Sequence, residues 1–248
     1  MTNKSPVTCV ILTQKTSNQL NRAIQSVQWC SEVLLAWTGT DTETIPHCTN
    51  VSVSLKNGFA DARNAALQHA KQPWILFLDD DEFASAPLKN TIQKLIQTPD
   101  CDVYAVRRRD IFMGKLLHFG ECGQISLTRL MKKGSAQWVR PVHETLQTHT
   151  NRNIGHISEP IIHTPHHTLS LFLQKINAYT AADAKYRAQQ GKQFSLFELF
   201  FFPVGKWIQS YILKGGIFDG YAGFIHASMM SIHSLSVRVK MYKGAKYA

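Results

Sequence analysis

The sequence predicts a mixed α/β fold, in which a mostly parallel central sheet is flanked by helices and followed by a helical C-terminal extension. In the first hundred residues, short apolar runs rich in β-branched residues alternate with amphipathic stretches, which is typical of a parallel sheet covered on both faces. From residue 168 onwards, apolar residues recur at helical spacing over long stretches. We therefore expect a first domain over residues 1–165 and a helical, basic and aromatic extension over residues 166–248.

The individual elements follow from these patterns in order. The first hundred residues predict four buried strands, at residues 7–13, 33–37, 51–55 and 74–78, and three helices, at residues 17–27, 60–71 and 87–97. Apolar pieces with glycine-containing links then predict an antiparallel extension of the sheet at residues 103–108, 125–131 and 157–163. Three long helices are expected at residues 169–189, 196–213 and 222–237.

Length and composition exclude several classes of protein. A chain of 248 residues with 44% hydrophobic and 18% charged residues can build a full core and is not disordered. Its five cysteines lack the spacing of a zinc site or a Cys-x-x-Cys pair, so we expect a reducing compartment rather than disulfides. The N-terminal apolar run at residues 7–12 is too short for a signal peptide or a membrane span, which predicts a cytoplasmic protein.

The net charge of +10 predicts an anionic partner, with nucleic acid, a phosphorylated sugar and an anionic membrane as candidates. Most of the excess comes from residues 185–248, where nine Lys and Arg residues stand against Glu198 and Asp219. In this region, the aromatic stretch at residues 194–213 is interrupted by charged residues, which argues against a membrane-spanning helix. The stretch is either a helix in the plane of a membrane or an ordinary docking helix.

Four acids in a row carry the strongest chemical signal. Asp79, Asp80, Asp81 and Glu82 directly follow the predicted strand at residues 74–78, at the sheet edge where α/β proteins bind ligands. Clustered carboxylates repel one another unless a cation neutralises them, and Mg²⁺ is usually held by one or two carboxylates together with substrate phosphates. The alternative is a solvated acidic loop before the next helix.

Two further segments carry weaker signals. Arg63 and the amides of the helix that begins after Gly58 are candidates for binding a diphosphate, although such residues also occur on solvated helix faces. Residues 138–144 contain His143 and Glu144, either of which is a candidate general base if the segment crosses the mouth of the sheet, whereas an ordinary surface loop is the alternative. Of the histidines clustered at residues 156–167, we expect at most His163 to approach a metal or a diphosphate.

The order of these motifs resembles family 2 glycosyltransferases with the GT-A fold. The motifs are Gly-Phe-x-x-x-Arg-Asn at residues 58–64, Leu-Asp-Asp-Asp-Glu at residues 78–82 and Val-His-Glu at residues 142–144. More narrowly, Phe-Leu-Gln-Lys-Ile-Asn-Ala-Tyr at residues 172–179 and the stretch Lys-Gly-Gly-Ile-Phe-Asp-Gly at residues 214–220 are similar to lipopolysaccharide core β-1,4-glucosyltransferases. The resemblance covers nearly the whole chain.

The resemblance implies roles for residues that match these motifs. Asp79 and Asp81 would hold Mg²⁺ or Mn²⁺, and Asp79 and Asp80 would contact the nucleotide sugar together with Arg63. Glu144 would deprotonate the acceptor hydroxyl for an inverting transfer. Further candidates for the diphosphate or the acceptor are Arg129, His143 and His163.

The chain departs from the family after the second predicted strand. Where relatives have Asp-Ser-Gly-Ser, this chain has Trp-Thr-Gly-Thr at residues 37–40. Trp37 is therefore expected to stack on the nucleotide base, or Asp41 to replace the missing carboxylate. A second departure, at residues 120–126, affects the region before Arg129 and leaves the acceptor unassigned.

The expected activity is transfer of a sugar from a nucleotide sugar, with a UDP-sugar as first candidate, to a cell-envelope glycan or glycolipid of the lipopolysaccharide type. The basic extension would hold the protein peripherally at the inner leaflet of the inner membrane, and no nucleic-acid partner is expected. Two alternatives remain: a non-catalytic basic module that binds nucleic acid or acidic glycan, and a nucleotidyltransferase, which would release pyrophosphate.

Overall fold

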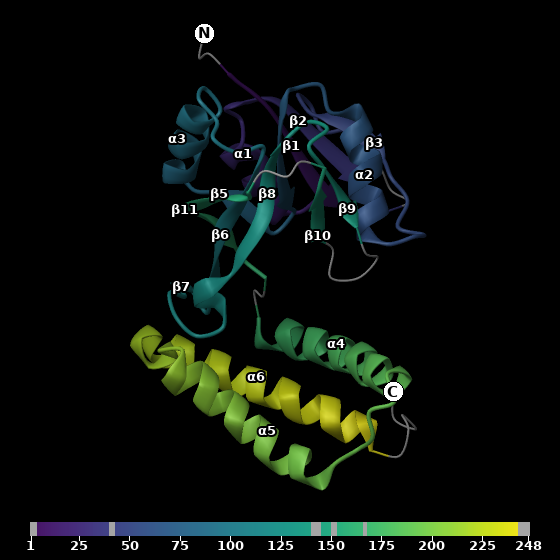
Figure 1. Cartoon of the computed structure of the whole chain (residues 1–248), viewed down its shortest axis with the longest axis vertical. Coiled ribbons are helices and arrows are strands. Elements are labelled where there is room, and N and C mark those ends of the chain that lie inside the picture. Colours follow the sequence, from purple (N-terminus) through teal and green to yellow (C-terminus); the bar gives the residue numbers. More distant parts are fainter. Residues whose placement is uncertain (1–3, 40–42, 140–144, 150–152, 166–167, 243–248) are drawn as a thin grey trace. The chain divides into compact units, whose positions relative to one another are not determined.

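The computed structural model describes residues 4–39, 43–139, 145–149, 153–165 and 168–242. The chain divides into two compact units, and Figure 1 labels their elements. The first unit comprises Met1–Arg108 and Ser126–His163, and the second comprises Arg109–Ile125 and Thr164–Ala248. The sheet domain and the helical extension are therefore described separately below.

The first unit is built on a mixed sheet with the strand order β3-β2-β1-β4-β8-β6-β11-β5. The first four in this order are parallel, namely β3 (Thr49–Ser52), β2 (Cys30–Trp37), β1 (Ser5–Thr13) and β4 (Trp74–Asp79). Antiparallel pairing then adds strands that include β8 (Ser126–Lys132), β6 (Val103–Phe112), β11 (Gly155–His163) and β5 (Glu82–Ala84). The predicted mixed α/β fold is confirmed. A separate two-stranded sheet, β9 (Ala136–Val139) and β10 (Thr145–Thr148), was not predicted.

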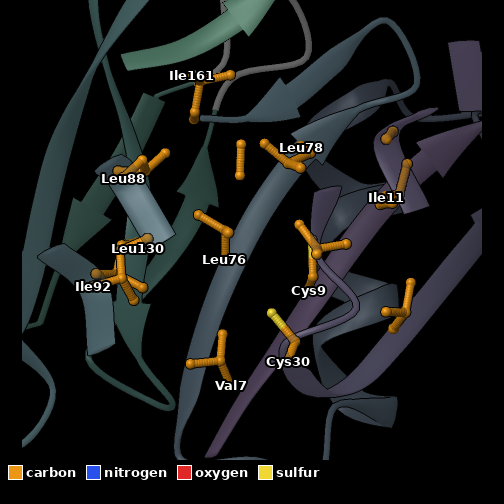
Figure 2. Packing of buried hydrophobic residues seen from close by; sticks show 14 of the residues in the cluster. Val7, Cys9, Ile11, Cys30, Leu76, Leu78, Leu88, Ile92, Leu130 and Ile161 are labelled. Carbon is orange, nitrogen blue, oxygen red and sulfur yellow. The ribbon is translucent and has the colours of Figure 1, made fainter. Parts of the chain in front are cut away.

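Helices cover both faces of this sheet because successive side chains of a buried strand point to opposite faces. Val7, Cys9 and Ile11 of β1 join the core beneath α1 (Asn18–Ser26) and α3 (Ala86–Leu95), as Figure 2 shows from close by. Val10 and Leu12 of the same strand join the core beneath α2 (Phe59–His69) on the other face. Every residue of β1 after its second is buried, as expected for a strand covered on both sides.

Local capping explains where the first and third helices begin. The Ser17 side chain accepts a hydrogen bond from the Leu20 amide at 3.0 Å, and the Ser85 side chain accepts one from the Leu88 amide at 3.3 Å. Pro87 lies in the first turn of α3, where its missing N–H costs nothing. These signals agree with the helix starts predicted from the sequence.

The second unit contains three long helices, α4 (Leu169–Gln189), α5 (Leu196–Ile208) and α6 (Gly220–Met241), and α6 contacts both of the others. The π-helical turn η2 (Gln209–Leu213) and the 3₁₀ turn η3 (Gly216–Asp219) join α5 to α6, while β7 (Lys115–Leu116) and η1 (Cys122–Gln124) precede the helices in the chain. A side chain at Gly223 would collide with the Gly216 carbonyl, so α6 packs closely against η3. Within the described part of the chain, no helix is both long enough and apolar enough to cross a membrane.

Candidate active site

The carboxyl edge of the parallel strands brings together residues that are far apart in the sequence. Thr13, at the end of β1, is in register with Trp37 of β2, and its neighbour Leu12 is in register with Asp79 at the end of β4. The Thr13 hydroxyl donates a hydrogen bond to Asp80 Oδ2 at 2.9 Å. The acid run therefore begins at the sheet edge that binds ligands in open α/β folds.

Asp79 is held between two arginines from different elements. Arg63 Nη2, from α2, lies 2.8 Å from Asp79 Oδ1, and Arg129 Nη2, from β8, lies 2.8 Å from Asp79 Oδ2. Burial opposes ionisation of Asp79, but the charges of Arg129 and Arg63 outweigh it and hold the pKa of the carboxyl well below its ordinary value. Asp79 is therefore an anion whose two oxygens both accept hydrogen bonds from arginine.

Glu82 extends this network into the interior. Its Oε1 accepts a hydrogen bond from Arg129 at 2.9 Å, and its Oε2 accepts one from the Asp79 backbone amide at 3.2 Å. Arg108 Nη1 lies 4.0 Å from the same Oε1. Glu82 is only 1% exposed, so it contacts Arg129 from the protein interior and is not accessible to a substrate. Burial raises the pKa of its carboxyl, as does repulsion from Asp79, while Arg129 opposes the shift.

Asp81 and His163 form a second cluster beside the first. The antiparallel pairing of β11 with β5 places His163 opposite Glu82, and His163 Nε2 then lies 3.4 Å from Asp81 Oδ2. The Asp80 carboxyl is partly buried, and burial and repulsion from Asp81 and Asp79 raise its pKa, against the hydrogen bond from Thr13. Among the described residues, no three His, Cys, Asp or Glu side chains gather as in a closed metal site.

Trp138 of β9 lies against Arg63. The Arg63 guanidinium lies 4.7 Å from the centre of the Trp138 ring, within cation–π range. Two hydrogen bonds between Asn64 and the Trp138 backbone, at 2.8 and 2.9 Å, attach β9 to α2. Residues 140–144 follow directly, so the predicted bases His143 and Glu144 lie outside the described residues, as does Asp41.

Trp37 does not have the position that stacking on a nucleotide base requires. Its ring is 1% exposed, and its Nε1 donates a hydrogen bond to Asn50 Oδ1 at 3.0 Å. The prediction for Trp37 is therefore corrected, because an indole at the end of a central strand gains more from burial in the core than from exposure. Position 39, shortly after this strand, needs a glycine, because a Cβ there would lie 2.5 Å from the Gln14 carbonyl oxygen.

The structure thus brings most of the predicted site residues to one place, namely Arg63, Asp79, Asp80, Asp81, Arg129 and His163. Sequence reasoning missed the parts played by Glu82, Thr13 and Arg108. Glu82 stood within the acid run, and Thr13 ends a strand that is parallel to β4, so both carried a usable signal. Arg108 carried none, because its position near Glu82 depends on where β6 lies in the sheet, two strands away from β4.

The amino-acid sequence matches a protein family model and several known proteins. The sequence model described as Glycosyl transferase family 2 matches residues 45–178. The lipopolysaccharide core biosynthesis glycosyltransferase LpsC of Rhizobium meliloti is 22% identical over 256 residues, which cover 98% of this chain and 94% of LpsC. An uncharacterized glycosyltransferase of Rickettsia felis is 22% identical over 246 residues, with 91% of this chain and 85% of the relative covered.

Two solved structures are also similar. The mannosyltransferase PcManGT from Pyrobaculum calidifontis, in complex with GDP-Man and Mn²⁺, has 14% identity and a TM-score of 0.48, with 97% of this chain and 88% of that chain covered. S. aureus TarS 1-349 in complex with UDP-GlcNAc has 12% identity and a TM-score of 0.47, with 98% and 93% covered. The region matched by the family model is more than half of the chain and includes the whole arginine and carboxylate network. The protein is therefore a glycosyltransferase, and the chain belongs to glycosyl transferase family 2.

Proposed function

We propose that this glycosyltransferase moves a sugar from a nucleotide sugar, with a UDP-sugar as first candidate, to a hydroxyl of a cell-envelope glycan or glycolipid, with inversion at the anomeric carbon. One observation carries the proposal. At the carboxyl edge of the sheet, two buried arginines neutralise Asp79, while Asp81 and His163 lie side by side next to it. The similarity to LpsC supports an acceptor of the lipopolysaccharide type.

Asp81 and His163 fit a divalent cation that takes its other ligands from the substrate. Their Oδ2 and Nε2 atoms are 3.4 Å apart, and carboxylate and imidazole are both ligands that Mn²⁺ accepts, whereas Mg²⁺ relies on the carboxylate. Such a cation, when bound, would offset the charge of the departing nucleoside diphosphate. Because both oxygens of Asp79 already accept from arginine, we assign Asp79 to positioning Arg63 and Arg129, which differs from the ligand role that the resemblance implies.

The transfer step needs a base and a leaving group. We assign the base to Glu144, by resemblance, with His143 as the alternative. The base takes the proton of the acceptor hydroxyl, whose oxygen bonds to the anomeric carbon while the bond from that carbon to the diphosphate oxygen breaks. Arg129 lies between Asp79 and Glu82, and Arg63 pairs with Asp79, so both guanidinium groups are held close to the acid run.

We also propose that the enzyme works at the cytoplasmic face of the inner membrane, where a lipid-linked acceptor would be available. The support is the basic C-terminal region, whose ten Lys and Arg residues stand against three Asp and Glu residues between positions 164 and 248. Such an excess favours an anionic lipid surface.

The test is binding and turnover of nucleotide sugars by the full-length protein, with Mn²⁺, Mg²⁺ or a chelator. We expect metal-dependent donor binding and release of a nucleoside diphosphate. Asp81→Asn and His163→Ala should each weaken donor binding at least about tenfold, because each removes a ligand of the cation. Asp61→Asn is the matched control, since Asp61 is an exposed carboxylate on α2.

Three results would overturn the proposal. Release of pyrophosphate would indicate nucleotidyl transfer instead of sugar transfer. Donor binding that is unchanged by chelator and by Asp81→Asn would exclude the assigned cation site. A retained configuration at the anomeric carbon of the product would exclude the inverting step.

A further inference from the structure

Helix α5 and the turn η2 carry their apolar side chains on the outside. We define the α5 apolar face as Phe197, Phe200, Phe201, Val204, Ile208 and Leu213, which are all exposed. Phe200 is 66% exposed and Leu213 is 76% exposed. Between Leu196 and Leu213, no exposed side chain is charged. A surface helix of a soluble protein has the reverse arrangement, with its charged face outward.

The charged residues of the same segment point toward the rest of the second unit. Glu198 Oε2 lies 3.6 Å from Arg238 Nε on α6, and Lys206 Nζ forms an ion pair with Glu121 Oε1. Lys214, which follows η2, lies 3.9 Å from the same Glu121 oxygen. These charges, which interrupt the aromatic stretch in the sequence, are therefore neutralised on the packed side of α5. Their pairing leaves no exposed charge on the outer side of α5 and η2.

Hydrogen bonds fix this orientation. Trp207 Nε1 donates to Ser228 Oγ at 3.2 Å, and Ser231 Oγ donates to the Pro203 carbonyl at 2.8 Å. The Arg238 guanidinium also lies 4.4 Å from the centre of the Phe202 ring. Since α5 is anchored to α6 along its length, rotating the apolar face inward would break these contacts. The exposed face is therefore a stable feature of the second unit.

We propose that the α5 apolar face inserts into the acyl-chain boundary of a lipid bilayer, with α5 and η2 lying in the membrane plane. The only exposed polar side chain between Leu196 and Leu213 is Gln209, whereas a protein–protein interface normally needs about one hydrogen bond per 100–200 Å². The positive charge of the second unit complements an anionic lipid surface around the inserted helix. The segment is amphipathic, with its charges paired on the packed side and its apolar side chains outward, and this arrangement suits insertion in the membrane plane.

The inference rests on the proposed function for the presence of a membrane partner and goes beyond it in the mode of attachment. Attachment by charge alone is lost at high salt, while insertion of aromatic side chains is not. The two modes therefore predict different behaviour on neutral vesicles and in concentrated salt.

The test is flotation of the full-length protein with vesicles of phosphatidylcholine alone and of phosphatidylcholine with phosphatidylglycerol. We expect binding to both, stronger with phosphatidylglycerol, and persisting at about 1 M salt, where the Debye length is about 3 Å. The double variant Phe200→Ser/Phe201→Ser should lower the vesicle partition coefficient about tenfold or more. The matched control is Tyr179→Ser/Tyr186→Ser on α4, whose rings are 64% and 61% exposed, and it should bind like the wild type.

Donor binding separates this inference from the proposed function, because the α5 double variant should bind nucleotide sugar as the wild type does. Wild-type binding that is confined to anionic vesicles and released by salt would overturn insertion. An equal loss of vesicle binding in the α4 control variant would also overturn insertion. An absence of vesicle binding by the wild type would overturn it as well. Sedimentation that shows a wild-type dimer, dissociated by Phe200→Ser/Phe201→Ser, would assign the face to a second copy of the chain instead.

Discussion

Arg129 Nη2 lies 2.8 Å from Asp79 Oδ2, and this contact links a central strand of the sheet to the end of the strand that carries the acid run. The same nitrogen lies 2.9 Å from Glu82 Oε1, so one guanidinium bridges the two ends of the run. Burial disfavours the charge on Arg129, but Asp79 and Glu82 outweigh burial and raise the pKa of the guanidinium. Arg129 is therefore the permanent cation around which the candidate site is arranged.

Removing this cation should destabilise the first unit. Arg129→Met leaves Glu82 buried without its closest counter-charge, and we expect the free energy of unfolding to fall by about 3–5 kcal/mol, as for other broken buried pairs. Urea unfolding measures the change. Lys132→Met is the control, because Lys132 is an exposed cation on the same strand and its loss should change stability by less than about 0.5 kcal/mol. If Arg129→Met and Lys132→Met lower the free energy of unfolding equally, Arg129 stabilises the first unit only through its positive charge and not through its buried pairs.

Glu82→Gln should separate positioning from direct contact with substrate. The amide keeps the shape of the side chain but loses the charge that faces Arg129 and Arg108, so we expect a stability loss of about 1–3 kcal/mol. Because Glu82 is buried, we expect KM for the donor to change less than it does in Asp81→Asn. Steady-state kinetics on both variants provides the comparison. A larger rise in KM for Glu82→Gln than for Asp81→Asn would contradict a positioning role.

Trp37→Phe tests the packing role assigned to this residue. The substitution removes the hydrogen bond to Asn50 and leaves space in the core, and we expect a loss of about 1–3 kcal/mol in stability. Donor affinity should stay within about twofold of the wild type, because the buried ring has no face open to a base. Equilibrium binding of the donor to the wild type and to Trp37→Phe distinguishes a packing role from a stacking role. A tenfold loss of affinity in a variant that remains folded would restore the stacking role.

His226 should make the stability of the second unit depend on pH. Burial lowers the pKa of its imidazole, against the raising influence of Asp110, Glu121 and Asp219. The unfolded chain therefore binds this proton first as the pH falls, so the stabilisation is complete above the ordinary pKa of 6.5 and is lost below it. Helix unfolding followed by circular dichroism between about pH 8 and pH 5 should show the decline.

His226→Phe should reduce that dependence, since a phenyl ring carries no proton and can keep the ring contacts with Phe112 and Phe172, while the pKa of His233 on α6, which burial also lowers, leaves part of the slope. His156→Phe, at an exposed position on β11, is the control and should keep the wild-type slope. If the His226 variant keeps the full slope between these pH values, another group is responsible for it.

Local patterns were sufficient to predict much of the fold. The parallel strands, the three helices that cover them and the long helices of the second unit follow from apolar periodicity, which depends on neighbouring residues alone. The acid run at the end of β4 was predicted for the same reason, since a buried strand followed by carboxylates is visible in nine consecutive residues, 74–82. By contrast, β5, β9 and β10 have only three or four residues each, too few for a periodic signal.

By itself, the sequence determined the α/β architecture, the place of the acid run at the carboxyl edge and the basic, aromatic character of the C-terminal region. Only the tertiary structure decided which partners those residues have. It paired Asp79 with arginines from α2 and β8, buried Trp37, and turned Glu198 and Lys206 inward so that the phenylalanines of α5 face out. The physical reason is that periodicity reports the polarity of a face, whereas the partner of a charge depends on residues brought close by long-range packing.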